Sequence, residues 1–505
     1  MLFNSLEFIF LFLPITLVVF YQIGDRGYYQ PALAWLVLAS LFFYQVWNPD
    51  YLRLLIFSVS INYIIGSILY KSPATGRYRK LLLVLGIILN LMAIGYFKYT
   101  YFAIDNLNHI LGTNFNFTHL ILPLAISFFT FQQVAYLVDT YKGKARDYSF
   151  VEYIFFVTFF PQLIAGPITC HRAIIEQLGQ KSIYKFSVDK VAIGLTIFLI
   201  GLFKKVLLAD PISVHVSPVF DAANLGTNIR FFEAWSATLA YTFQLYFDFS
   251  GYSDMAVGCA WMFGITIPVN FNSPYKAANI IDFWRRWHIT LSNFLRDYLY
   301  IPLGGNRLGE LRRTSNLMVT MLLGGLWHGA GWTFIVWGGL HGLYLIINHQ
   351  WHFLQKCFGW NLKDIPILSY IFGCIITFLA VVISWVFFRA IDLQSAIAIV
   401  KSMMGVNGVS FASAYVSSSK ILLLHLIVLG LWVWLLPNPQ EWMGKYHPLA
   451  DADSIQTDNN WIDRFNPKWK WQPNPALGII LGTLVFLVVK IFFQAPKSDF
   501  LYFNF

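Results

Sequence analysis

Long apolar runs recur along the whole chain, and short polar loops separate them. A helix of about 20 apolar residues is long enough to cross the roughly 30 Å hydrocarbon core of a bilayer. The pattern therefore predicts about a dozen spanning or re-entrant helices. We place them at 6–21, 32–47, 52–70, 81–96, 120–141, 148–168, 188–208, 231–264, 317–348, 368–388, 421–436 and 477–493.

Composition and charge agree with this pattern. Of the 505 residues, 57% are hydrophobic and only 12% are charged, whereas soluble domains carry about a quarter charged residues. The net charge of +10 comes from Lys and Arg in short loops, which is typical of cytoplasmic loops rather than of a nucleic-acid surface. We expect the basic loops 71–80 and 141–146 to lie inside and the N-terminus outside. The first helix starts with Glu7 in place of a basic region, so we expect it to be retained.

These features predict an all-α polytopic membrane protein with one membrane domain over residues 1–505. The stretch 440–475 is the one long polar segment, and we expect it to be an extramembrane loop. Segment 148–168 carries Pro161, Gly166 and Pro167 between two basic flanks, which favours a re-entrant path. A short interfacial helix is expected at 173–178.

Polar side chains inside apolar segments need partners. Gln132 lies in segment 120–141 and Asp248 in segment 231–264, so we expect both to face the protein interior or a wet cavity. Asp248 should meet a cationic side chain or water. Lys204 and Lys205 come near the end of segment 188–208, where we expect them to snorkel to an interface.

Two histidines give the chain candidate chemistry. His288 closes the sequence WRRWH, in what reads as an amphipathic helix over 283–300, and it falls on the apolar flank, which points inward. His328 lies in GGLWHG, where glycines allow close approach and Trp327 forms a bulky wall. A basic turn and a long apolar run separate the two, so we expect them on different helices.

Several reaction types lack their motifs. There is no HExxH, no GxSxG, no phosphate-binding loop, and the four cysteines have no metal-binding or redox spacing. A histidine acting as a general base on a hydroxyl remains, because a thioester donor is already activated and needs no metal. His328 would take the proton, and His288 would bind the acceptor or steady the oxyanion. A non-enzymatic transporter with an intramembrane relay is the alternative from another class.

We also expect six side chains to contribute to substrate binding. Basic residues at a cytoplasmic mouth could attract phosphates, although ordinary positive-inside anchoring explains them equally well. The six are Gln132, Asp248, Trp284, Arg285, Arg286 and Trp327.

The two histidine elements resemble those of the membrane-bound O-acyltransferase (MBOAT) family, in its bacterial alginate O-acetyltransferase branch. They are FWRRWH at 283–288 and WHG at 327–329, and further similar stretches are LPLAISFFTFQ, PQLIAGPI, YFDFSGYSDMAVG, NFNSPY and LRDYLYIPLGGNR. The resemblance covers most of 122–342, and nothing after about Trp351 matches.

The resemblance implies a ring of helices around a central funnel that holds the histidine pair. It also implies an acetyl group taken from cytoplasmic acetyl-CoA, with no bound cofactor or metal, and delivered towards hydroxyls of an exported polysaccharide such as alginate. An extracytoplasmic acetyltransferase partner and the bacterial inner membrane as location follow from the same resemblance. D-alanyl transfer to teichoic acid, or acetylation of peptidoglycan or cellulose, keeps the chemistry and changes the substrate.

Overall fold

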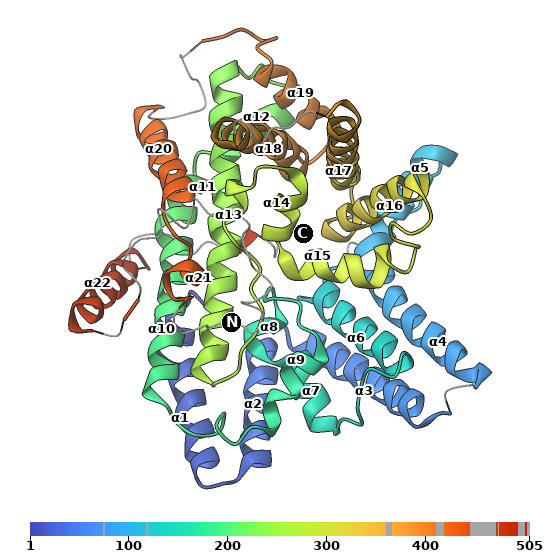
Figure 1. The fold of residues 1–505 in the computed structure, drawn as a ribbon, viewed down its shortest axis with the longest axis vertical. Helices are drawn as coiled ribbons and strands as arrows, with labels where there is room; N and C mark the ends of the chain where they lie inside the picture. Colours follow the sequence, from blue (N-terminus) through green and yellow to red (C-terminus); the bar gives the residue numbers. More distant parts are fainter. Residues whose placement is uncertain are drawn as a thin grey trace. The chain divides into compact units, whose positions relative to one another are not determined.

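The computed structural model describes residues 1–73, 76–117, 120–359, 366–410, 419–444, 471–472, 474–492 and 500–501. Every regular element in these residues is helical, and they contain no strand. Figure 1 labels the helices along the chain. The chain divides into two compact units, each assembled from separate stretches. The first comprises Met1–Leu202, Tyr252–Val269 and Met443–Val485; the second comprises Phe203–Gly251, Asn270–Trp442 and Phe486–Phe505. The single domain over 1–505 stays a prediction, and most of the predicted loop 440–475 lies outside the described residues.

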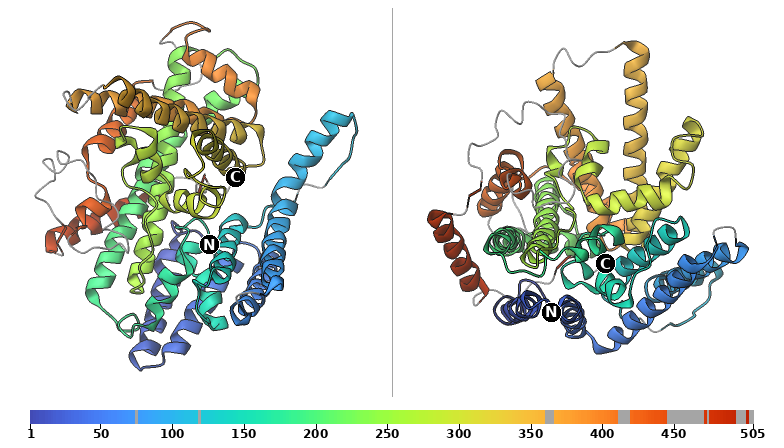
Figure 2. Two further views of the ribbon diagram at one scale, coloured as in Figure 1. Left: turned by 45° about the vertical axis from the view of Figure 1, so that its right-hand side comes forward. Right: turned by 60° about the horizontal axis from the view of Figure 1, so that its bottom comes forward.

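The first unit holds the N-terminal helices. Figure 2 shows α4, η2 and α5 following one another as a single long rod. The elements are η1 (Phe8–Phe12), α1 (Leu13–Asp25), α2 (Tyr29–Gln45), α3 (Pro49–Lys71), α4 (Arg77–Ile94), η2 (Gly95–Tyr99), α5 (Thr100–Leu111), α6 (Ile126–Tyr141), α7 (Phe150–Thr158), α8 (Phe160–Leu163), α9 (His171–Ile175), η3 (Gln177–Gly179) and α10 (Val188–Phe203).

The second unit holds the residues of the histidine elements. Its elements are η4 (Lys204–Ala209), α11 (Asp210–Ser213), α12 (Ser217–Asn224), η5 (Pro274–Lys276), α14 (Ile280–Arg286), α15 (Ile289–Leu295), η6 (Arg296–Tyr300), α16 (Glu310–His328), α17 (Trp332–Phe358), α18 (Pro366–Arg389), α19 (Leu393–Met403), α20 (Ser419–Leu435) and α21 (Pro439–Trp442). Helices α13 (Phe231–Met262) and α22 (Pro475–Phe492) contribute residues to both units.

By length and composition, five helices of the described residues can cross a membrane: Phe8–Asp25, Pro49–Lys71, Arg77–Leu111, Val188–Ser213 and Ile367–Arg389. Three shorter apolar helices accompany them. An all-helical, multi-pass membrane protein is thereby confirmed. The number of about a dozen crossings, the ring and the funnel stay predictions.

The helix within the segment 148–168 is interrupted, whereas its re-entrant path stays a prediction. Helix α7 stops at Thr158, Phe159 leaves helical geometry with φ −50° and ψ 112°, and α8 restarts with Pro161 in its first turn. Beyond Leu163 the chain continues without a regular helix to α9. Such backbone is tolerated in an apolar segment only when protein buries it, and Pro161, Gln162 and Leu163 are all buried.

The predicted helix over 283–300 is wrong as a single element. Helix α14 ends at Arg286, the backbone turns at His288, and α15 starts at Ile289 and passes into the π-helical η6. His288 has φ 42° and ψ 55°, the left-handed region that L-residues other than Gly, Asn and Asp seldom adopt. The hydrophobic pattern was compatible with one helix because the buried residues Trp284 of α14 and Leu291 and Leu295 of α15 recur at helical spacing.

Glycines set the distance between α16 and α17, which lie side by side in the second unit (Figure 1). A Cβ atom added at Gly325 would collide with the Phe334 carbonyl, and one at Gly338 would collide with the Met321 carbonyl. The two backbones can therefore approach closely only because both positions lack a side chain. This pairing fixes the end of α16, where His328 lies, against the first turns of α17.

Candidate active site

His288 is fully buried at the break between α14 and α15. Its Nδ1 lies 3.3 Å from Asn270 Oδ1, and Thr290 donates a 2.6 Å hydrogen bond to the same oxygen. The Phe249 ring meets the imidazole edge to face at 4.9 Å. His288 lies outside the five candidate spans, and burial lowers its pKa, so the imidazole is neutral at neutral pH. A neutral imidazole can accept and donate a proton, as acid–base chemistry requires.

The loop 270–276 and α14 hold His288 in this place. Backbone hydrogen bonds run from Asn272 N to Arg286 O at 2.9 Å and from Ile289 N to Asn270 O at 3.0 Å. They flank the histidine on both sides. The loop is therefore hydrogen-bonded to the chain on both sides of His288. These bonds help to hold His288 in its left-handed conformation, which is unfavourable without support from the surrounding structure.

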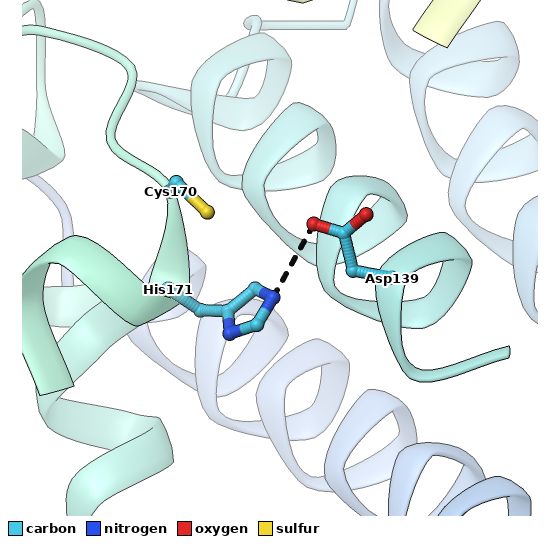
Figure 3. Close-up of side chains that lie close together, drawn as sticks. All are labelled: Asp139, Cys170 and His171. Atoms are coloured by element: carbon cyan, nitrogen blue, oxygen red, sulfur yellow. Dashed lines mark ion pairs between the residues drawn. The ribbon is translucent and has the colours of Figure 1, made fainter. Parts of the chain in front are cut away.

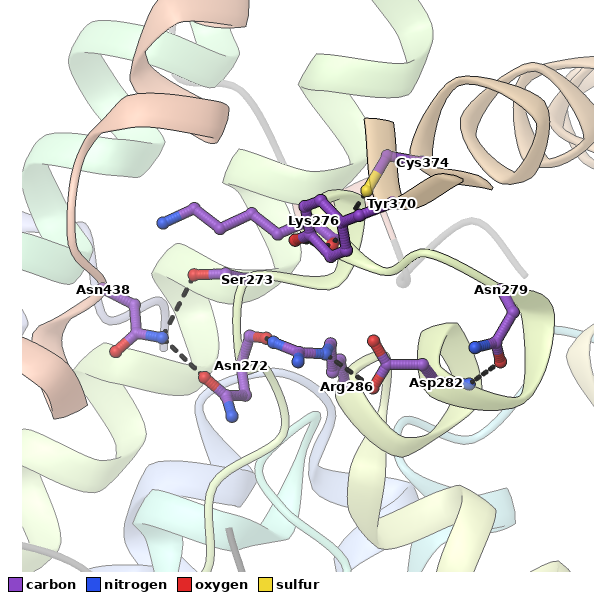
Figure 4. A network of polar contacts seen from close by, with 9 residues as sticks. All are labelled: Asn272, Ser273, Lys276, Asn279, Asp282, Arg286, Tyr370, Cys374 and Asn438. Atoms are coloured by element: carbon purple, nitrogen blue, oxygen red, sulfur yellow. Dashed lines mark hydrogen bonds and ion pairs between the residues drawn. The ribbon is translucent and has the colours of Figure 1, made fainter. Parts of the chain in front are cut away.

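A polar network fixes the loop from outside (Figure 4). Asn438 Nδ2 donates to Asn272 Oδ1 at 2.7 Å and to Ser273 Oγ at 3.1 Å. The Lys276 carbonyl accepts from Tyr370 Oη at 2.8 Å and from Cys374 Sγ at 3.3 Å, both on α18. Hydrogen bonds to Asn438 and to α18 leave this loop little freedom. Both segments belong to the C-terminal third, for which the sequence offered no motif.

His328 is the last residue of α16 and is 4% exposed. Aromatic rings surround its imidazole, with centroid distances of 4.8 Å to Trp327, 5.0 Å to Trp337 and 5.1 Å to Phe388. The helix ends here, and Gly329 and Gly331 beyond it both have extended backbone. The prediction that the two histidines belong to different helical elements is confirmed.

The two imidazoles share one neighbour, the Trp327 indole. Its centroid lies 6.2 Å from that of His288 and 4.8 Å from that of His328. The two histidine rings can therefore be no more than about 11 Å apart, the sum of these two distances. Both rings and the indole belong to the second unit, so the pair is brought together within one compact body.

A third histidine, His341, lies in the same aromatic cluster, and we had given it no role. Its Nε2 is 2.9 Å from Ser384 Oγ, and its ring is 4.7 Å from Trp337 and 5.2 Å from Trp284. Trp337 and His341 are four residues apart on α17. This helical spacing on one face was the available signal.

The cluster contains buried polar atoms without a hydrogen bond in the described structure: Trp284 Nε1, Trp337 Nε1 and His341 Nδ1. Buried polar groups are nearly always hydrogen-bonded to protein or water. Two N–H donors and a ring nitrogen close to His328 therefore provide contacts that water or a bound polar molecule could make.

The predicted substrate-binding residues of α14 lie in different surroundings. Trp284 is buried against Trp337 and His341, and Arg285 is exposed. Arg286 is buried, and its Nε donates to Asp282 Oδ1 at 2.8 Å (Figure 4). Of the two arginines, Arg285 is the one that solvent reaches. Substrate binding by these residues stays a prediction.

Asp248 is paired as predicted. Its Oδ1 lies 2.5 Å from Lys205 Nζ, and Lys205 also lies 2.9 Å from Asp210 Oδ1. The snorkelling predicted for Lys204 and Lys205 is wrong, because both are buried and Lys205 sits between two carboxylates. A buried carboxylate without a cation is strongly destabilising. Pairing with Asp248 therefore stabilises the protein more than hydration of the Lys205 ammonium at a surface would.

Residues near the C-terminus also reach this neighbourhood. Leu501 N donates a 3.0 Å hydrogen bond to Asp248 Oδ2, and the buried Phe500 ring lies 5.7 Å from Phe249. Phe249 in turn contacts His288. No motif marked residues 500–501 in the sequence, and only the fold connects them with the histidine.

Gln132 belongs to the first unit. It is buried on α6, and its Nε2 is 3.5 Å from Thr169 Oγ1, whose hydroxyl donates to Gln162 Oε1 at 2.6 Å. It faces the protein interior, as predicted for a polar residue in an apolar helix. Its proposed contact with substrate stays a prediction.

Apolar spanning helices and a buried aromatic cluster with three histidines define a multi-pass membrane protein with a candidate acid–base site. A sequence model of MBOAT, the membrane-bound O-acyltransferase family, matches residues 87–390. That is more than half of the chain and includes both histidine elements. The chain belongs to the membrane-bound O-acyltransferase family, and the predicted resemblance is confirmed.

Three relatives show the range of named activities. The chain is 46% identical to a peptidoglycan O-acetyltransferase of Helicobacter pylori, over 84% of this chain and 83% of that protein. It is 36% identical to a probable alginate O-acetylase AlgI of Pseudomonas putida over the full length of both. It is 28% identical to a teichoic acid D-alanyltransferase of Streptococcus thermophilus over 52% of this chain and 68% of that protein.

Proposed function

We propose that this protein transfers an acetyl group from cytoplasmic acetyl-CoA towards hydroxyls of an exported polysaccharide such as alginate. His328 acts as the general base and His288 as the second polar group of the site. We place the protein in the bacterial inner membrane, where it works with an extracytoplasmic acetyltransferase. The observation that carries the proposal is the shared contact of both buried imidazoles with the Trp327 indole.

In the proposed step, His328 takes the proton of an acceptor hydroxyl as its oxygen attacks the thioester carbonyl. A C–O bond forms, and a tetrahedral oxyanion develops that an N–H donor stabilises. The indole N–H groups of Trp284 and Trp337 are the donors available for this role. His288 directs Nδ1–H at Asn270 Oδ1, so its Nε2 would accept a hydrogen bond from a hydroxyl of the bound acceptor. The C–S bond then breaks, and the thiolate of CoA recovers the proton from His328. No oxidant, metal or additional base is needed for this balance.

The surroundings of His328 support this role. Trp337 and Phe388 pack against its ring and hold the orientation of the imidazole. Water-excluded aromatic surroundings also strengthen any hydrogen bond to a developing charge. The neutral His288 can hold the acceptor through Nε2 without gaining or losing a proton.

Peptidoglycan is the second candidate acceptor. The observation that favours it is the 46% identity to the peptidoglycan O-acetyltransferase of Helicobacter pylori over 84% of the chain. Both acceptors present carbohydrate hydroxyls, so the same proton transfer serves either. Transfer of D-alanine to teichoic acid has weaker support, because that relative covers about half of the chain.

The proposal is tested by His328→Ala, with His352→Ala as the matched control. His352 is an exposed histidine of α17 whose Nδ1 lies 3.1 Å from Gln355 Oε1. In cells that depend on this protein, His328→Ala should abolish O-acetylation of the polysaccharide, and His352→Ala should leave it at the wild-type level. Alginate and peptidoglycan are assayed separately to identify the acceptor.

The donor and the competing transporter function are tested together. Membrane vesicles supplied with radiolabelled acetyl-CoA should release free CoA and pass label to an acceptor, and His328→Ala vesicles should not. Both variants must elute as monodisperse protein in detergent at wild-type yield. Full acetylation by His328→Ala would refute the catalytic role, and polymer flux without an acyl donor would support the transporter.

A further inference from the structure

A second cluster of metal-ligating side chains lies in the first unit, outside the histidine pair. Asp139 comes from the last turn of α6, and Cys170 and His171 stand at the start of α9. One ligand atom from each lies within 4.8 Å of the other two. Figure 3 shows the imidazole directed at the carboxylate with the thiol beside them. We propose that Asp139, Cys170 and His171 bind a zinc ion.

The separation of the histidine and carboxylate atoms supports a metal rather than a direct hydrogen bond. His171 Nε2 lies 3.4 Å from Asp139 Oδ2, and Nε2 makes no hydrogen bond to any described residue. A charge-assisted N–H···O bond is about 2.7–2.9 Å long. In a tetrahedral zinc site with Zn–N and Zn–O near 2.05 Å, the two ligand atoms are about 3.4 Å apart. The observed spacing matches the second geometry.

Tyr148 orients the histidine for this task. Its Oη lies 2.7 Å from His171 Nδ1, and the His171 side chain is completely buried. When Nδ1 carries the proton and donates to Oη, the lone pair of Nε2 points at the Asp139 carboxylate. A cation placed between Nε2 and the carboxylate would bind both atoms. A hydrogen bond from the distal nitrogen of a ligating histidine to a neighbour is the usual support in metal sites.

The thiol completes the donor set and indicates the metal. Cys170 is exposed, so its side chain can rotate about one bond to approach the other two atoms and is open to entering metal. One sulfur, one nitrogen and one carboxylate oxygen suit Zn²⁺, which accepts all three and prefers four-coordinate geometry. Water fills the fourth position. The nearby basic loop 141–146, which we expect in the cytoplasm, would place the cysteine in a reducing compartment.

Such an ion would fasten the end of α6 to the start of α9. The chain between α8 and α9 contains no regular helix, and direct hydrogen bonds such as that of Thr169 to Gln162 hold it. A bound zinc would add a fixed point at its far end. This site has no sequence motif, because Asp139 is distant in sequence from the Cys170–His171 pair, and we predict no metal from the sequence.

The experiment uses the full chain purified in detergent, stripped of metal and titrated with Zn²⁺ against a competing chromophoric chelator. We expect one equivalent to bind and Cys170→Ser to weaken binding by about 10-fold or more, since even outer-shell losses cost 10–100-fold. Cys357→Ser is the matched control, because it removes another exposed thiol and should bind zinc like the wild type. Tyr148→Phe should weaken binding by about 10-fold while leaving all three ligands.

Cobalt replaces zinc for a spectroscopic readout. Co²⁺ bound to wild-type protein and to Cys357→Ser should show thiolate-to-metal absorption in the near ultraviolet, and Cys170→Ser should lack it. Equal Zn²⁺ affinity in Cys170→Ser and wild type, or no stoichiometric binding to wild type, would overturn the proposal. The second result would leave Tyr148, His171 and Asp139 as a hydrogen-bonded structural relay. Neither measurement depends on acyltransferase activity.

Discussion

Two adjacent glycines of α17 provide a sharp test of how the fold positions His328. A Cβ at Gly338 would collide with the Met321 carbonyl of α16, whereas a Cβ at Gly339 would meet only Leu322 Cδ2, at 3.6 Å. The second distance is an ordinary van der Waals contact with the end of a flexible side chain. Gly338→Ala must therefore push the helices apart, and Gly339→Ala fits without movement.

The magnitude follows from comparing the two variants. Replacing an interior helical Gly by Ala stabilises a helix by about 1 kcal/mol, and this gain is common to both. Forcing a methyl group into a closely packed contact costs about 1–3 kcal/mol, and only Gly338→Ala incurs it. The free energies of unfolding should therefore differ by about 1–3 kcal/mol, which corresponds to about 2–4 °C in thermal midpoint per kcal/mol for a unit of this size.

Activity should separate the variants further. The His328 imidazole packs on Trp337, the residue before Gly338, so a shift of α17 alters the position of the proposed base. A misplacement of about 1 Å can cost about 100-fold in rate. We measure thermal unfolding in detergent and O-acetylation in cells. If Gly338→Ala matched Gly339→Ala in both assays, close helix approach would not be what positions the histidine.

Two further substitutions test the surroundings of His288. Lys205→Met should lower the free energy of unfolding by about 3–5 kcal/mol, because it leaves the buried Asp248 without its cation; an unchanged thermal midpoint would contradict this. Thr290→Val removes the 2.6 Å hydrogen bond to Asn270 Oδ1 and should cost about 1 kcal/mol. Because the same oxygen contacts His288, acetylation should fall in Thr290→Val while the protein remains folded, and wild-type acetylation would argue against a positioning role.

Much of the architecture was predictable from local patterns. Long apolar runs predicted an all-helical membrane protein, and the polar residues within them marked positions that must find partners. Asp248 illustrates this: a carboxylate in an apolar helix had to be paired, and Lys205 pairs it. The physical cost of an uncompensated buried charge made that prediction independent of any knowledge of topology.

The positions at which helices are interrupted were harder to predict from the sequence. Nothing in WRRWH signals that His288 adopts a left-handed conformation, because the stretch contains no glycine, the residue that most readily adopts a positive φ. Long-range contacts impose that geometry, chiefly the loop 270–276. Lys205 was misplaced for a related reason: the carboxylates that hold it come from separate elements. Asp139 and His171 likewise meet only in the folded chain.

Both histidines of the candidate site lie where a helix is interrupted. His288 lies where α14 gives way to α15, and His328 is the final residue of α16. Inside a helix, the backbone N–H and C=O groups are hydrogen-bonded to each other. At an interruption, some of these groups have no partner within the helix and need hydrogen bonds from other parts of the protein or from bound molecules. Both histidines thus occur where local backbone is already specialised and where surrounding aromatic rings keep lipid away. The residue that follows is extended and has to be glycine, because a Cβ at Gly329 would overlap the Phe334 ring. The end of the helix, rather than the apolar run that contains it, therefore defines the position of the proposed base.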